Sequence, residues 1–104
     1  MKYRDSVYTI ALLGVFSGAL AHTPICDCYD NGDDTITCEG GFSDGASAAG
    51  IAMRVLDSNG RILLEGAMSD RSDFTFDKPD GNYRVEFEGG DGHLIQIDGR
   101  DIEE

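Results

Sequence analysis

The chain has 104 residues, enough for one domain. Its 20 acidic residues against eight Lys and Arg give a formal charge of −12. Such a surface repels nucleic acid and anionic lipid, so we expect neither as a partner. The same acidity favours solubility and attracts cations weakly.

The first 21 residues are predicted to be a secretory signal peptide and to lie outside the domain. A basic start at Met1–Arg4 is followed by the apolar run Ile10–Phe16, which is too short to span a membrane. Ala19–Ala21 then has the small-x-small pattern of a cleavage site. We therefore expect a signal-peptide helix, cleavage after Ala21, and a protein exported to the periplasm or the extracellular space. An uncleaved N-terminal anchor helix is the alternative.

Cleavage after Ala21 defines a single mature domain, residues 22–104, with a formal charge of −13. A lipid anchor is not expected, because a lipid-modified cysteine should directly follow the small-residue box and Cys26 lies four residues further on. A domain of this size is near the lower limit of independent stability. Export would allow disulfides to supply part of the missing stability.

The domain is predicted to begin with a cysteine-bearing hairpin within residues 22–39. Asn31-Gly32 favours a tight turn, because both residues tolerate a positive φ. Residues of strand character on either side predict strands at Ile25–Tyr29 and Thr35–Glu39. Gly40-Gly41 is expected to form a bulge or a bend that leaves the second strand.

Apolar and polar residues alternate in short runs through the rest of the chain, and turn residues close each run. The alternation predicts an all-β fold, an antiparallel two-sheet sandwich of about seven short strands of prealbumin-like or immunoglobulin-like type. The absence of Trp, and of Cys beyond position 38, excludes an immunoglobulin disulfide framework. The five strands expected after the hairpin are Ile51–Leu56, Arg61–Met68, Phe74–Phe76, Tyr83–Phe87 and His93–Asp98.

Five segments share a characteristic order of turns and aromatic residues: Phe42-x-Asp44-Gly45, Ala49-Gly50-Ile51-x-Met53-x-Val55-x-Asp57-x-x-Gly60-Arg61-x-Leu63, Ser69-Asp70, Phe74-x-Phe76 and Gly81-x-Tyr83-x-Val85. This order resembles the carboxypeptidase regulatory-like (prealbumin-like) family. The resemblance covers about half of the chain. It implies a seven-stranded β-sandwich, often appended to other proteins and without catalysis of its own. Two features depart from the family: Ser72-Asp73 stands where a Gly is usual, and the cysteine hairpin is not a general family feature.

No catalytic motif is present, so we do not expect an enzyme. His22 and His93 are the only histidines. A mature N-terminal His22 would offer its amine and a ring nitrogen to one metal, and imidazole suits Cu, Ni and Zn. The terminal His is similar to the copper sites of small periplasmic β-sandwich copper carriers, and resembles exported accessory proteins of nickel and cobalt uptake. The plainer alternative is that His22 merely follows the cut and that His93 is a half-buried strand-end residue.

Three cysteines leave one without a partner inside the chain. A loop of three or five residues centred on Gly32 would place Cys26 opposite Cys38. We therefore predict a Cys26–Cys38 disulfide and a free Cys28 thiol. The functional alternative is ligation of a soft metal by thiolates, with Cys28 joining His22.

The sequence thus predicts an exported, non-catalytic accessory protein that handles a transition metal. Cu or Ni would bind through His22, His93 and Cys28, and a membrane transporter or another envelope protein would receive it. The alternative is a plain protein- or glycan-interaction module that binds no metal.

Overall fold

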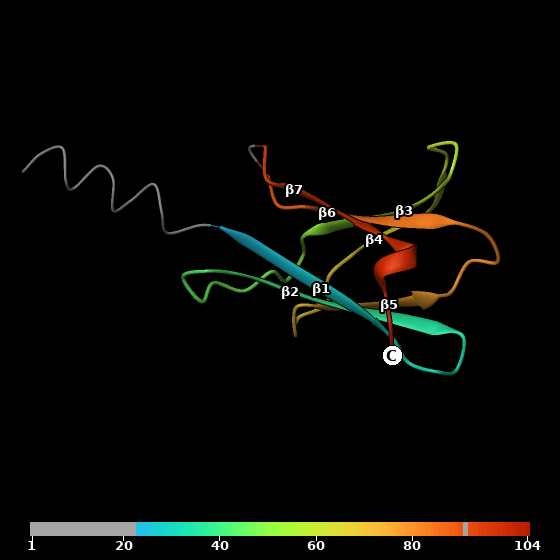
Figure 1. Ribbon diagram of the computed structural model, residues 1–104. Coiled ribbons are helices and arrows are strands. Elements are labelled where there is room, and N and C mark those ends of the chain that lie inside the picture. Colours follow the sequence, from blue (N-terminus) through green and yellow to red (C-terminus); the bar gives the residue numbers. More distant parts are fainter. Residues whose placement is uncertain (1–22, 91) are drawn as a thin grey trace, which may run out of the picture.

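The computed structural model describes residues 23–90 and 92–104. Two antiparallel sheets face each other as a sandwich (Figure 1). Sheet A has the strand order β1-β2-β5, and sheet B has the order β4-β3-β6-β7. The predicted two-sheet sandwich is therefore confirmed. The strands are β1 (Pro24–Asp30), β2 (Thr35–Phe42), β3 (Ala52–Asp57), β4 (Ile62–Ala67), β5 (Asp73–Asp77), β6 (Tyr83–Glu88) and β7 (Leu94–Asp98).

The core lies between the sheets, because every second residue of the central strands points inward. Met68 and Ala48, from the segments that flank β3 and β4, close the core at its side. The predicted signal peptide, residues 1–21, and His22 lie outside the described residues. The largest fully buried side chains are Phe87, Ile36, Met53, Val55, Val85 and Cys38.

Strand β2 runs straight through Gly40-Gly41 and ends at Phe42, so the predicted bulge or bend at the two glycines is wrong. Gly40 pairs with Cys26 and faces the core. A Cβ on Gly40 would stand 2.8 Å from Phe87 Cε2 and 3.0 Å from Met68 Sδ. Glycine is therefore needed here because other side chains occupy the space, and the strand continues past it.

Ser72, just before β5, is one of two non-glycine residues with a positive φ in the described part of the chain. Its φ is +62°, in the left-handed region. Its hydroxyl accepts a hydrogen bond from the Ala48 amide at 2.9 Å and lies 3.0 Å from Ser47 Oγ. These contacts hold a serine in a turn that glycine would adopt without strain.

Strand β4 carries a bulge that explains its run of three aliphatic residues. Val55 pairs with Leu64 and Leu56 pairs with Ile62, which leaves Leu63 without a partner in β3. The extra residue breaks the period of two, so no single face of β4 is apolar. Only Leu64 packs against the core.

The chain ends in a short 3₁₀ helix, η1 (Gly99–Asp101), followed by a tail that contacts sheet A. Asp30 N donates a hydrogen bond to Glu103 O at 2.9 Å. Ile102 packs against the core. Strands β1 and β7 also contact each other, so this side of the sandwich is closed by the chain itself.

Candidate functional site

The disulfide joins Cys28 to Cys38, with an S–S distance of 1.98 Å, and Cys26 is a buried free cysteine. The predicted Cys26–Cys38 pairing and the free Cys28 thiol are therefore wrong. Cys28 and Cys38 are direct partners across β1 and β2, whereas Cys26 lies opposite Gly40. The strand pairing thus differs from the predicted one by two residues.

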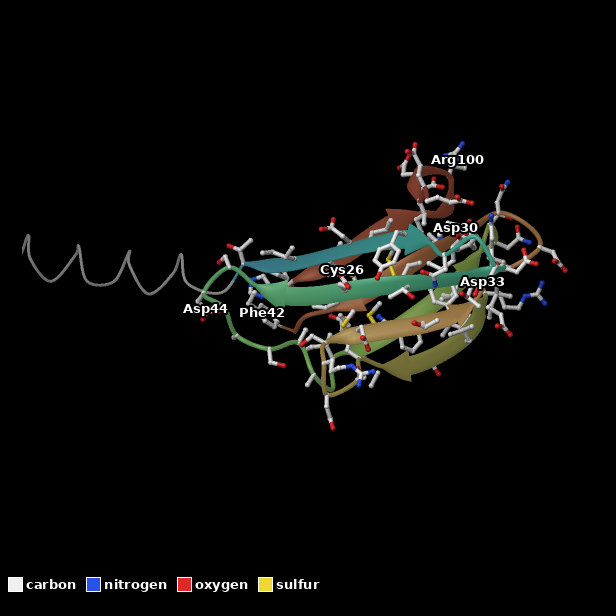
Figure 2. All side chains as sticks on the ribbon, turned by 90° about the horizontal axis from the view of Figure 1, so that it is seen from below. Cys26, Asp30, Asp33, Phe42, Asp44 and Arg100 are labelled. Atoms are coloured by element: carbon white, nitrogen blue, oxygen red, sulfur yellow. A yellow bond between two sulfur atoms is a disulfide. The ribbon has the colours of Figure 1, made fainter. Side chains whose placement is uncertain are left out.

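The hairpin loop explains this difference, because it is centred on Asp33 and not on Gly32. Asn31 N donates to Thr35 O at 3.0 Å and closes the loop. Both Gly32 and Asp34 adopt a positive φ, at 82° and 70°. Carboxylates support the turn: Asp30 Oδ1 accepts from Gly32 N, and Asp33 Oδ1 accepts from Thr35 N. Figure 2 shows Asp30 and Asp33 together at this end of the sandwich.

The three cysteine sulfurs lie within 4.8 Å of one another, inside the sandwich near Cys26 in Figure 2. Among residues 23–90 and 92–104, this is the only group of three or more potential metal ligands that the fold brings so close. Two of the sulfurs are bonded to each other, so Cys28 offers no thiolate to a metal. Burial, reinforced by the charge of Asp27, raises the pKa of the Cys26 thiol to about 11. The cluster is thus a disulfide beside a neutral thiol.

His93 is exposed and directly precedes β7, so the alternative of a half-buried histidine does not hold. Its backbone is held in the turn between β6 and β7. His93 N donates to Gly90 O at 2.8 Å, and Gly89 N donates to His93 O at 3.0 Å. Its ring has no hydrogen-bond partner among the described residues and is open to solvent.

The start of β1 and the start of β7 lie at the same end of the sandwich (Figure 1). Pro24, at the start of β1, pairs with Phe42, whose ring centroid lies 6.2 Å from that of Phe87. Phe87 pairs with Ile95, two residues beyond His93. The end that carries His93 is therefore also the end at which the chain enters β1.

Glu86 is the one charged residue that is buried within the described part of the chain. It lies on the outer face of sheet B. Gln96 Nε2 donates to one carboxylate oxygen at 2.9 Å, and Arg54 Nε donates to the other at 3.1 Å. The Gln96 hydrogen bond, followed by the bond and charge of Arg54, lowers the pKa of Glu86. A lowered pKa does not suit a general acid, which would need a raised one.

A groove of about 400 Å³ lies beside β4, at the end of sheet B opposite to His93. The sequence patterns alone did not predict this groove. The sequence feature that could have indicated the groove is the unbroken aliphatic run Ile62–Leu64. Regular alternation would bury part of such a run, whereas a bulged edge strand exposes it. The lining residues are Asp57, Leu63, Leu64 and Asp77–Asn82.

Comparisons with known proteins returned no match, whether against family models, curated proteins or solved structures. The resemblance to the carboxypeptidase regulatory-like family therefore stays a prediction. None of the helices in the described part of the chain has the length and apolar character needed to cross a bilayer. The Cys28–Cys38 disulfide indicates a non-reducing environment.

Proposed function

We propose that the protein is an exported, non-catalytic β-sandwich that binds a transition metal through its mature N-terminus. The bound ion is Cu or Ni, and a membrane transporter or another envelope protein receives it. The observation that carries the proposal is that β1 and β7 begin at the same end of the sandwich. His22 directly precedes the first described residue, and His93 directly precedes β7.

The N-terminal arm is held close to this end of the molecule. Thr23 N donates to Ser43 Oγ at 3.2 Å, and Ser43 N donates to Thr23 O at 2.8 Å. These two bonds hold the residue that directly follows His22. An arm fixed at its base restricts the volume that the terminal amine and imidazole can explore. That restriction favours chelation together with the exposed His93 ring.

The chemistry of the donors suits Cu(II) and Ni(II). The free amine and imidazole of an N-terminal histidine bind one ion as a chelate, and a second imidazole adds a third nitrogen. These groups bind only when deprotonated, so affinity should rise with pH. The formal charge of −12 raises the local cation concentration, an effect that weakens as salt rises.

Export supports the proposal, because only cleavage after Ala21 would free the His22 amine. The disulfide agrees with export, since such bonds persist in oxidising compartments such as the periplasm. Intact mass of the secreted protein should correspond to a chain that starts at His22. A secreted chain that retained residues 1–21 would contradict both the export signal and the terminal chelate.

The decisive experiment compares three proteins by calorimetry with Cu(II) and with Ni(II) at fixed pH and salt. They are the mature chain, the same chain with one Met before His22, and the His93→Ala variant. The added Met keeps every other residue and removes only the terminal amine from the chelate, so affinity should collapse by orders of magnitude. His93→Ala should bind at least about tenfold more weakly. Equal affinity of the extended and the mature chains would refute the proposal.

The exposed edge of β4 favours a second candidate, a plain interaction module that binds a protein or glycan without metal. Ile62 and Leu63 on β4 are each 47% exposed. In that case the calorimetry would show no difference among the three proteins.

A further inference from the structure

Strand β4 ends sheet B and leaves one backbone edge without a neighbouring strand. In the described part of the chain it pairs with β3 alone. Five of its six residues are exposed. An unpaired strand edge presents N–H and C=O groups that a further strand can bind.

On the opposite side of the sandwich, β1 and β7 also end their sheets, but the chain itself covers part of that side. There β1 and β7 contact each other, and the chain end adds the Asp30 N to Glu103 O bond. On the β4 side, Gly66 lies against Phe74 of β5, where a Cβ would stand 2.6 Å from Phe74 Cε1. Phe74 fills the interior behind β4 and leaves the outer edge of the strand uncovered.

The groove of about 400 Å³ continues this open edge. Leu63 and Leu64 line it from β4, and Pro79 lines it from the loop between β5 and β6. A regular strand would place two consecutive leucines on opposite faces. The bulge in β4 instead brings Leu63 and Leu64 to the same groove. An apolar side chain of an added strand therefore has a place to insert.

The charges around the groove indicate which kind of segment can bind there. Asp57, Asp77 and Asp80 line the groove, Asp57 in an ion pair with Arg61 at 3.4 Å, and Glu65 is exposed on β4 itself. The single lysine of the lining, Lys78, is paired with Asp30 at 2.9 Å. The surroundings of the edge are thus acidic, so a cationic segment is attracted and an acidic one is repelled.

The same charges argue against a second copy of this chain as the occupant. Pairing two β4 edges would bring two acidic surfaces together. Each chain also carries a formal charge of −12. Like charges juxtaposed at an interface disfavour association, so a partner of opposite charge is favoured over self-association.

We propose that the β4 edge and its groove are a docking site for an extended segment of another protein in which Lys or Arg alternate with apolar residues. The segment adds a strand beside β4, inserts one apolar side chain against Leu63 and Leu64, and places its cations beside Asp77 and Asp80. This surface is separate from the metal-binding proposal, since the groove and His93 lie at opposite ends of β6. Either proposal can fail without the other.

The test uses two synthetic peptides of about ten residues, one alternating Lys and Val and the other alternating Glu and Val. Each is titrated into the ¹⁵N-labelled mature chain without metal, followed by NMR. The Lys-Val peptide should shift amide signals of β4 and of residues 77–82, and should protect β4 amides from hydrogen exchange. Raising the salt from about 0.05 M to about 0.5 M should weaken binding several-fold. The Glu-Val peptide should bind at least about tenfold more weakly.

Two variants and one matched control locate the site. Leu63→Ser should weaken Lys-Val binding at least about tenfold, because it removes an exposed apolar contact. Leu94→Ser changes an equally large and similarly exposed residue (43%) on the other outer strand, β7, and should leave binding unchanged. The double variant Asp77→Asn/Asp80→Asn removes two exposed charges without altering packing, and should weaken binding while the spectrum of β6 stays unchanged.

Three results would overturn the docking proposal. The first is the absence of β4 shifts at about 1 mM peptide, the weak limit of a specific contact. The second is equal binding of the Lys-Val and Glu-Val peptides. The third is a concentration-dependent dimer, detected by sedimentation and abolished by Leu63→Ser, which would make a second copy the occupant.

Discussion

The ring of Phe87 on β6 fills the space beside Gly40 on β2, so that a Cβ on Gly40 would lie 2.8 Å from Phe87 Cε2. This contact joins the two sheets toward the end of the sandwich that carries His93. Phe87 is fully buried. Its position explains why β2 carries a glycine in the middle of a paired, regular strand.

We expect Gly40→Ala to destabilise the protein by about 1–3 kcal/mol, because the added methyl must displace a buried ring or Met68. Gly41→Ala is the matched control. Its Cβ would have one neighbour within 4 Å, Ala46 O at 3.8 Å, which is an ordinary contact. Chemical denaturation of both variants measures the difference. Equal unfolding free energies for the two would show that the Phe87 contact does not restrict this position.

Loss of the disulfide should lower the free energy of unfolding by about 3 kcal/mol, since the bond closes a short loop of about 11 residues. Cys28→Ala removes the bond, whereas Cys26→Ala keeps it and changes only a buried thiol. Denaturation with and without a dithiol reductant should therefore distinguish the variants. The reductant should destabilise the Cys26→Ala protein and leave Cys28→Ala unaffected. A non-reducing peptide map that linked Cys26 to either other cysteine would contradict the assigned pairing.

Stability should fall as the pH drops from about 4 to about 2, because several carboxyl groups have a lowered pKa in the folded state. Hydrogen bonds from the Arg100 side chain and amide lower the pKa of Asp98 to about 2. A lowered folded pKa stabilises the protein above the unfolded value near 3.8, and this stabilisation is lost as pH falls through the folded pKa. Asp30, bonded to Lys78, and Asp57, bonded to the Arg61 amide, shift in the same direction.

The variant Asp98→Asn isolates one of these groups. It should flatten the stability profile between pH 4 and pH 2 compared with the parent protein, as measured by thermal melts at constant ionic strength. Asp44→Asn provides a comparison at an exposed turn carboxylate that accepts a backbone hydrogen bond from Ala46. An unchanged profile for Asp98→Asn would mean that the Arg100 contact does not persist in solution.

The alternation of apolar and polar residues was sufficient to predict the strands and the sandwich. In Tyr83–Glu88, each inward residue is apolar and buried, because a strand presents successive side chains to opposite faces. The Asn31-Gly32 signal likewise located the hairpin correctly. These features depend on local backbone preference and on burial of one face, both of which are properties of the sequence itself.

Only the tertiary structure decided the cysteine pairing. Which cysteines pair depends on whether the hairpin loop is centred on Gly32 or on Asp33. Moving the centre of the loop by one residue shifts the pairing between β1 and β2 by two residues. Asp34 at a positive φ and the carboxylates of Asp30 and Asp33 support the loop in its shifted position. Many residues can occupy such a turn, so the sequence does not specify where the loop is centred.

The open edge at β4 also depended on packing between distant segments. The sequence marks Ile62–Leu64 as apolar, but their exposure follows from a bulge against β3 and from the place of β4 at the end of its sheet. The placement of the starts of β1 and β7 at the same end of the sandwich likewise follows from the packing of the two sheets. The sequence by itself determined which residues form strands and which face of each is apolar, because these are local properties. The order of strands in each sheet joins residues far apart in the chain, so only the folded structure decided which edge is open and which residues meet at one end.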